Sequence, residues 1–352
     1  MQDVAIVSFV QSDCVRHAGA QNEVELIMPV VQAALKEAGL SSVQDVDFTC
    51  SGSCDYQQGA AFAFVAGVDA LGAVPPIKES HVEMDAAWAL YESWLKIQMG
   101  QAESALIYGF GKSSPGQLSN VLSLQLDPYY LAPLGVDTIS LAAMQARSLL
   151  ESGEVSEADL AEVVVNSRAN AKNNPHAQLS GDFTVDQLLA EPETVSPLRK
   201  HDCCPISDGA AAMIICTVEK AKAMGKPYAV IKGIDHRIET HHVTLRDLSR
   251  SPSVEIAAEK AGVHDAPVDV AEIYAPFSHQ EIIVKRALGL DDSVAINPSG
   301  GVLAGHLFMA SGLSRVGEVA KRIIAGEYKR GVAHATSGPC LQQNMITVLE
   351  GM

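Results

Sequence analysis

His201-Asp-Cys-Cys-Pro-Ile-Ser-Asp-Gly-Ala-Ala-Ala-Met213 is the stretch that says most about how this chain folds. Its first part, through Gly209, is rich in proline, serine, aspartate and glycine, which favour turns. The part after Gly209 is small and apolar. The local pattern therefore predicts a turn that enters a buried strand, and by itself it predicts no function.

A second glycine-rich stretch follows about 90 residues later. It is Asn297-Pro-Ser-Gly-Gly-Val-Leu-Ala-Gly-His306, and its local pattern is that of a glycine loop. Either stretch alone has an ordinary structural interpretation.

Short apolar runs alternate with longer amphipathic stretches outside these segments. Val4–Val10, Val46–Cys50 and Ser104–Tyr108 read as strands, whereas Glu23–Gly39 and Ala86–Met99 have helical spacing. Strands that alternate with helices predict an α/β fold with a largely parallel sheet.

The second part of the chain repeats the order of the first. Ala34-Leu-Lys-Glu-Ala-Gly-Leu40 leads to the predicted strand at 45–48, and Ala258-Glu-Lys-Ala-Gly-Val263 leads to the one at 268–272. We therefore expect two duplicated halves, residues 1–225 and 226–352. Residues from about 112 to 200 are too many for a simple connection, so we expect them to form an inserted loop or cap region in the first half.

Composition excludes several classes of function. The 352 residues include 25 Lys and Arg against 42 Asp and Glu, a formal charge of −17, which argues against a nucleic-acid partner. Neither a signal-peptide pattern nor an apolar window long enough to span a bilayer is visible. The seven cysteines fit reduced thiols better than a disulfide framework. We expect a cytoplasmic protein without a membrane segment.

Taken together, the two stretches resemble segments of thiolases, especially those of the sterol-carrier-protein type. There the first segment enters the last strand of the N-terminal half, and the second carries a catalytic histidine. The resemblance implies a thiolase fold: two βαβαβαββ halves in a five-layered αβαβα arrangement with an inserted loop or cap domain.

Active thiolases resemble one another at four positions, and this chain departs from that pattern. The nucleophilic cysteine that opens a helix corresponds to Asp85, within Glu83-Met-Asp-Ala-Ala-Trp88. The strand-end Asn or His corresponds to Tyr274 in Tyr274-Ala-Pro-Phe277. His306 is retained, and Cys340 matches the second cysteine.

A carboxylate at position 85 cannot replace a thiolate as the carrier of an acyl group, so ordinary thiolysis is not expected. The pattern resembles thiolase-like aldol lyases of steroid side-chain breakdown, which lack the nucleophilic cysteine and use tyrosines. That resemblance implies retro-aldol cleavage of a 3-hydroxyacyl-CoA. Two alternatives stay open: a non-catalytic subunit that supports an active paralogue, and Claisen-type or decarboxylative chemistry with a cysteine from a partner.

The four candidate residues have different expected roles. Tyr274 would be the acid/base group at the hydroxyl, His306 an enolate stabiliser or second proton donor, and Cys340 a weaker candidate for the α-carbon proton. Each also has a structural interpretation: a buried aromatic for Tyr274, a buried small residue for Cys340, and a helix cap for Asp85, which we weigh equally with a catalytic role.

The resemblance also implies partners. The related lyases work with an OB-fold, zinc-ribbon accessory protein that helps to bind the acyl-CoA, and thiolases are commonly at least dimers. Since CoA is an anion and this chain is acidic, we expect a partner to supply part of the CoA site. We expect a homodimer within a hetero-oligomer, no cofactor in this chain, and CoA only as part of the substrate.

Two further groups of residues were weighed as metal ligands. His236, His241 and His242 follow a predicted strand, and Cys50 and Cys54 lie close in sequence. Neither group has the paired spacing of a structural zinc site, so the sequence predicts no metal centre.

Overall fold

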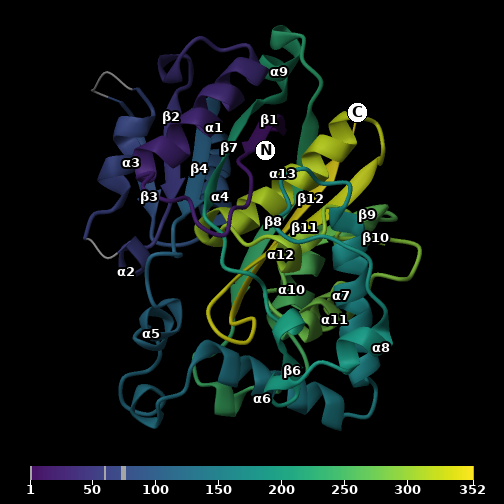
Figure 1. Cartoon of the computed structure of the whole chain (residues 1–352). Coiled ribbons are helices and arrows are strands. Elements are labelled where there is room, and N and C mark those ends of the chain that lie inside the picture. The colour runs from purple at the N-terminus through teal and green to yellow at the C-terminus, as the bar shows by residue number, and fades with distance from the viewer. Residues whose placement is uncertain (1, 59–60, 73–76, 352) are drawn as a thin grey trace.

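Ten strands form one mixed sheet in a computed structural model that describes residues 2–58, 61–72 and 77–351 (Figure 1). The strand order is β10-β9-β11-β12-β8-β1-β7-β4-β2-β3. These strands are β1 Val4–Gln11, β2 Phe48–Gly52, β3 Glu79–Val82, β4 Ser104–Gly111, β7 Gly209–Thr217, β8 Ala229–Ile238, β9 Val270–Ile273, β10 Ala295–Ile296, β11 Arg330–Ser337 and β12 Gln343–Glu350. β7 is buried along its whole length, which confirms that the segment ending at Met213 enters a buried strand.

The sheet repeats one pairing pattern on either side of its centre. In β3-β2-β4-β7-β1 the first three strands are parallel and the last two pairings are antiparallel, and β10-β9-β11-β12-β8 has the same pattern. β1 and β8 pair antiparallel and join the two sets. This repetition is what a duplicated architecture requires. Within the described residues, five of the nine pairings in this sheet are antiparallel, so the expectation of a largely parallel sheet is wrong. The boundary expected near residue 225 falls between α9 Val218–Met224 and β8, although the domain limits themselves remain a prediction.

Three apolar cores form where layers of helices pack against the strands. One core lies under α1 Glu23–Ala38, the central core contains α4 Ala86–Gln98 and α13 Ser311–Ile324, and the third lies under α10 Pro252–Ala261 and α11 Ser278–Ala287. The central helices therefore lie between the two sets of strands, with other helices outside (Figure 1). This is the expected five-layered α/β arrangement.

The residues between β4 and β7 form a separate, mostly helical region. Its elements are α5 Leu118–Ser123, α6 Thr138–Glu151, α7 Glu157–Ala171, α8 Val185–Leu189, and the small hairpin of β5 Glu193–Val195 with β6 Leu198–Arg199. α6 and α7 both pack against α11, and α7 also packs against α12 Gly301–Ala304. α6, α7 and α8 lie against the second half of the chain, below and beside it in Figure 1, although they belong to the first half in sequence. α5 instead lies below the first half and contacts α2 Asp55–Gln58.

Two observations bear on the environment of the chain. All seven cysteines are free thiols. Within the described ranges, no helix is both long enough and apolar enough to cross a membrane.

Candidate active site

A cavity of about 520 Å³ lies where both halves and the inserted region meet. The four sequence-predicted residues, Asp85, Tyr274, His306 and Cys340, all line it. The structure thus brings together positions that are up to 255 residues apart in the sequence (85 to 340). Most of the remaining wall is apolar and includes Leu118, Leu122, Leu126, Ile139, Phe277 and Phe308.

Tyr274 and His306 form a hydrogen-bonded pair in this cavity. The phenol oxygen of Tyr274, just after β9, is 2.7 Å from Nε2 of His306. Burial lowers the pKa of His306 to about 3, with a smaller contribution from the Arg315 cation, so the imidazole is neutral at pH 7. Burial raises the pKa of Tyr274 well above its ordinary value, and the negative charge of Asp85 adds to that shift. Both groups are therefore neutral at pH 7, and the phenol donates to Nε2 in the tautomer that carries the imidazole proton on Nδ1. The phenol oxygen is also 3.4 Å from the carbonyl oxygen of Phe308, a second acceptor for its proton.

Cys204 contacts the other ring nitrogen of His306 and was not recognised in the sequence as a site residue. Its Sγ is 3.5 Å from Nδ1, and it also lines the cavity. In the tautomer in which Nε2 accepts the Tyr274 proton, the neutral imidazole carries its own proton on Nδ1, which faces this sulfur. Burial raises the pKa of the Cys204 thiol to about 12, so the thiol is protonated at pH 7. The only sequence signal was its place in the Cys203-Cys204-Pro205 run.

Asp85 caps α4 and also joins two helix N-termini. Its carboxylate accepts backbone N–H groups of Ala87 at 2.8 Å, Gly312 at 2.8 Å and Leu313 at 3.2 Å. A side chain at Gly312 would place Cβ 2.6 Å from the Asp85 carboxylate, so glycine allows this close approach. Burial raises the pKa of Asp85 to about 7, although the three N–H groups favour the charged form. The cap expected for Asp85 is present, and its carboxyl borders the cavity.

Replacing Asp85 by asparagine should remove the titration of the Asp85 carboxyl, and with it a pH-dependent part of the free energy of unfolding. The folded-state pKa is about 7, against about 3.9 for an unfolded aspartate. Asp85 therefore adds to the free energy of unfolding. This contribution is fully present below its unfolded-state pKa and is lost as the pH rises through its folded-state pKa. We expect the wild-type free energy of unfolding, relative to Asp85→Asn, to fall by about 4 kcal/mol across this window. Urea unfolding at a series of pH values measures it, and a pH-independent difference would contradict it.

Cys340 lies in a small apolar cluster at the edge of the cavity. The cluster also contains Leu126, Leu131, Leu141 and Val243. The Cys340 thiol donates to the carbonyl oxygen of Leu141 at 3.4 Å, and burial raises its pKa to about 11. A catalytic role for Cys340 stays a prediction, and its surroundings equally suit the buried small residue weighed against it.

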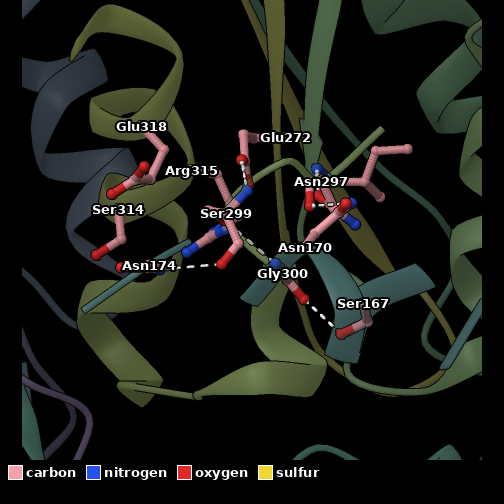
Figure 2. A network of polar contacts seen from close by, with 12 residues as sticks. Ser167, Asn170, Asn174, Glu272, Asn297, Ser299, Gly300, Ser314, Arg315 and Glu318 are labelled. Carbon is pink, nitrogen blue, oxygen red and sulfur yellow. Dashed lines mark hydrogen bonds and ion pairs between the residues drawn. The ribbon is translucent and has the colours of Figure 1, made fainter. Parts of the chain in front are cut away.

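The loop that carries His306 is fixed by a buried ion pair (Figure 2). Glu272, in β9, accepts the backbone N–H of Ser299 at 2.9 Å and the Ser299 hydroxyl at 2.7 Å. Arg315, on α13, pairs with the same carboxylate and also donates to the Ser299 hydroxyl at 2.6 Å. Glu272 is two residues from Tyr274, and Ser299 is in the loop leading to His306. The pair therefore connects the strand that holds the phenol with the loop that holds the imidazole.

The inserted region holds the same loop from the other side. The Ser167 hydroxyl donates to the carbonyl of Gly300 at 2.6 Å, and the Asn170 side chain donates to that of Asn297 at 3.0 Å. The Asn174 side chain donates to the carbonyl of Ser299 at 3.0 Å. Residues 167, 170 and 174 recur at helical spacing on and just after α7, as Figure 2 shows from close by. The insertion thus positions the histidine loop in addition to lining the cavity.

Gly300 lies close to α7. It has φ +92°, and a Cβ there would lie 2.7 Å from the Cβ of Ala171. We expect Gly300→Ala to lower the free energy of unfolding by about 1–3 kcal/mol, from left-handed strain plus the clash. Gly326→Ala is the control, because Gly326 also has positive φ, at +77°, but its Cβ would meet nothing within 4 Å. Denaturant unfolding of both variants measures the difference, and equal losses would mean that the contact with α7 contributes nothing.

Comparisons with known proteins support the thiolase resemblance. Residues 229–348 match the family described as "Thiolase, C-terminal domain". The chain is 28% identical over 351 residues to the acetyl-CoA acetyltransferase of Methanocaldococcus jannaschii, covering 91% of this chain and 89% of that protein. It is 26% identical over 314 residues to sterol carrier protein 2 of Oryctolagus cuniculus, covering 78% of this chain but only 57% of that protein.

Solved structures confirm the fold. The Ltp2-ChsH2(DUF35) aldolase superposes with a TM-score of 0.80 at 19% identity, covering 99% of this chain and 98% of that chain. Human mitochondrial 3-ketoacyl-CoA thiolase superposes with a TM-score of 0.79 at 19% identity, covering 100% and 99%. The chain has the thiolase fold, and part of its sequence is similar to the C-terminal domain of thiolases.

Proposed function

We propose that this thiolase-fold chain is a carbon–carbon lyase that cleaves a 3-hydroxyacyl-CoA by a retro-aldol reaction. The observation that carries the proposal is the hydrogen bond of 2.7 Å between the Tyr274 phenol and Nε2 of His306. The pair lines the same cavity as Asp85, the residue that caps the N-terminus of α4. Such a pair can accept a hydroxyl proton, which is the first requirement of a retro-aldol cleavage and needs no covalent acyl-enzyme.

Bond cleavage follows from a proton relay. The proton of the substrate 3-hydroxyl moves to the phenol oxygen of Tyr274 while the phenol proton moves to Nε2 of His306. The Cα–Cβ bond then breaks, Cβ becomes a ketone or aldehyde carbonyl, and the electron pair passes to Cα and the thioester oxygen as an enolate. Because burial lowers the pKa of His306, the imidazolium depends on the negative charge of the enolate beside it.

Protonation of the enolate completes the reaction. The α-carbon takes one proton from a donor in the cavity and gives a shorter acyl-CoA. The imidazolium passes its proton back through Tyr274, and this proton restores the donor, so that no net proton is consumed. Asp85 is a candidate donor to the α-carbon, because a carboxyl with a pKa of about 7 is partly protonated at neutral pH. Cys340 remains the weaker candidate, since its thiol donates to a backbone carbonyl.

The cavity and the charge of the chain indicate the kind of substrate and partner. A wall that is mostly apolar and includes leucine, isoleucine and phenylalanine side chains suits a bulky apolar acyl group, and we propose a steroid-type side chain. A net charge of −17 offers little attraction for the phosphates of CoA, so we propose that an OB-fold partner supplies part of that site. The similar aldolase structure bears the names of two components, Ltp2 and ChsH2(DUF35), which supports a hetero-oligomer.

Acyl transfer is a second candidate function. The Sγ of Cys204 lies 3.5 Å from Nδ1 of His306, and a cysteine beside a histidine is the usual arrangement for a thiol nucleophile. The acetyltransferase name of a relative also favours this reaction. Against it, the raised pKa of Cys204 leaves almost no thiolate at neutral pH.

One experiment separates these functions. The purified chain, alone and with an OB-fold partner, is incubated with a branched 3-hydroxyacyl-CoA and with the matching 3-ketoacyl-CoA plus free CoA. We expect the hydroxy substrate to yield a ketone or aldehyde and a shorter acyl-CoA. Thiolysis of the keto substrate, with an acyl adduct on the protein that Cys204→Ser abolishes, would favour acyl transfer. Neither product under either condition would favour the non-catalytic subunit.

A further inference from the structure

Three potential metal ligands converge from two distant segments of the chain. Asp127, in the inserted region, and the adjacent pair His241 and His242, after β8, each offer one ligand atom, and these atoms lie within 4.8 Å of one another. Nε2 of His241 is 4.0 Å from a carboxylate oxygen of Asp127. His236, expected to follow the strand together with this pair, instead lies within β8 and is not part of the cluster.

The carboxylate of Asp127 is held in place by its own turn. One oxygen accepts the backbone N–H groups of Tyr129 at 3.1 Å and Tyr130 at 2.6 Å. The other oxygen is the one that faces His241. The side chain is only 11% exposed, so its position is fixed by backbone contacts rather than by solvent. A carboxylate with one oxygen occupied and the other directed at an imidazole is prearranged for one-oxygen ligation.

The two imidazoles are available as ligands. Within residues 2–58, 61–72 and 77–351, no hydrogen bond to either ring is found. Their ring centroids are 4.1 Å apart, and the ring of Tyr130 packs edge-on against His242 at 5.6 Å. Imidazole nitrogens bound to one tetrahedral ion at about 2.0–2.1 Å must lie roughly 3.4 Å from the other ligand atoms. Closing the cluster therefore requires shifts of about 1 Å.

The cluster adjoins the cavity wall. Leu126, next to Asp127, lines the cavity, and Val243, next to His242, packs with Leu126 and Cys340. Arg246, four residues after His242, donates to the carbonyl of Cys340 and, at 3.2 Å, to that of Leu341, so the histidine loop also supports the cavity segment at 340–341. An ion bound at the cluster would connect the inserted region to the loop with His241 and His242 and, through that loop, to the cavity segment at 340–341.

We propose that Asp127, His241 and His242 bind one divalent transition-metal ion, with zinc as the best match. Two imidazoles and a carboxylate are a common ligand set for this class of ion, and a site with three protein ligands keeps a position for water. The site is separate from the Tyr274–His306 pair and does not depend on the proposed lyase function. Its effect is to join the cap to the second half at the rim of the cavity.

Metal binding is tested on untagged protein that has been stripped with EDTA, dialysed against Zn²⁺ and measured for bound metal. We expect about one Zn²⁺ per chain and a rise in Tm on adding Zn²⁺, because an ion that binds only the folded state stabilises it. Mg²⁺ should give neither effect, since it prefers oxygen ligands. A metal content near zero at micromolar Zn²⁺ would overturn the proposal.

Three variants show where the metal binds. Asp127→Asn keeps the oxygen that accepts the turn N–H groups but removes the charge, and the double variant His241→Ala/His242→Ala removes both imidazoles. Each should weaken binding by more than about 100-fold, since even changes outside the ligand shell cost about 10–100-fold. His264→Ala, at an exposed histidine outside the cluster, is the control and should bind like the wild type. Zinc that survives the double variant would belong to the cysteines and would refute the assigned site.

Discussion

Arg315→Ala should lower the free energy of unfolding by about 3–5 kcal/mol, because it leaves the Glu272 carboxylate buried without its cation. Both side chains of the pair are almost fully excluded from solvent, at 5% and 0% exposed. Burial already raises the pKa of Glu272, and the Arg315 cation is the largest of the contributions that lower it. Without Arg315, the carboxyl must either stay charged in an apolar surrounding or take up a proton. Denaturant unfolding at pH 7 measures the loss.

Two controls separate the buried charge from other effects of the substitution. The double variant Glu272→Gln/Arg315→Met removes both charges and keeps an oxygen for the Ser299 N–H, so it should regain most of the stability. Lys172→Ala breaks an ion pair whose side chains are 46% and 77% exposed, and should cost no more than about 1 kcal/mol. If Arg315→Ala costs no more than Lys172→Ala, then the buried pair does not stabilise the fold.

The ion pair also illustrates which parts of the site were predictable from sequence. Asp85, Tyr274 and His306 were identified through the resemblance to thiolases, because the local pattern alone indicated only a helix cap for Asp85 and a buried aromatic for Tyr274. The partners of Glu272 could not be predicted, because Arg315 is 43 residues away and no local spacing links them. For the same reason, the sequence indicated an insertion before β7 but gave no sign that its α7 would bind the histidine loop.

The fold was more predictable than the site because strand and helix periodicities are local, whereas the hydrogen bonds of the site are not. The helix expected at Glu23–Gly39 is α1, which ends at Ala38 with Gly39 as its left-handed C-cap. The region expected only as a loop or cap at about 112–200 contains the helices α5 to α8, and Pro175 and Gly181 lie between α7 and α8. Cys204 was missed because its contact with His306 spans 102 residues.

Tyr274→Phe should reduce kcat for cleavage of a 3-hydroxyacyl-CoA by about 100- to 10,000-fold, the usual contribution of a positioned acid/base group. The change removes one oxygen and leaves Nε2 of His306 without its donor, which should lower the free energy of unfolding by about 1–3 kcal/mol. The protein therefore stays folded, and the loss is chemical. Tyr91→Phe is the matched control, because Tyr91 is half-buried, packs on Trp94 and His236, and does not line the cavity.

The relay makes a sharper prediction than a loss of activity. If Tyr274 passes the hydroxyl proton to His306, neither residue can work without the other, so the effects of Tyr274→Phe and His306→Asn should not add. The kcat of the double variant should then be about the same as the kcat of the less active single variant. A double variant slower by the product of the two losses would show that the residues act independently. In that case Tyr274 would have to react as a phenolate, which its raised pKa and neutral neighbour oppose.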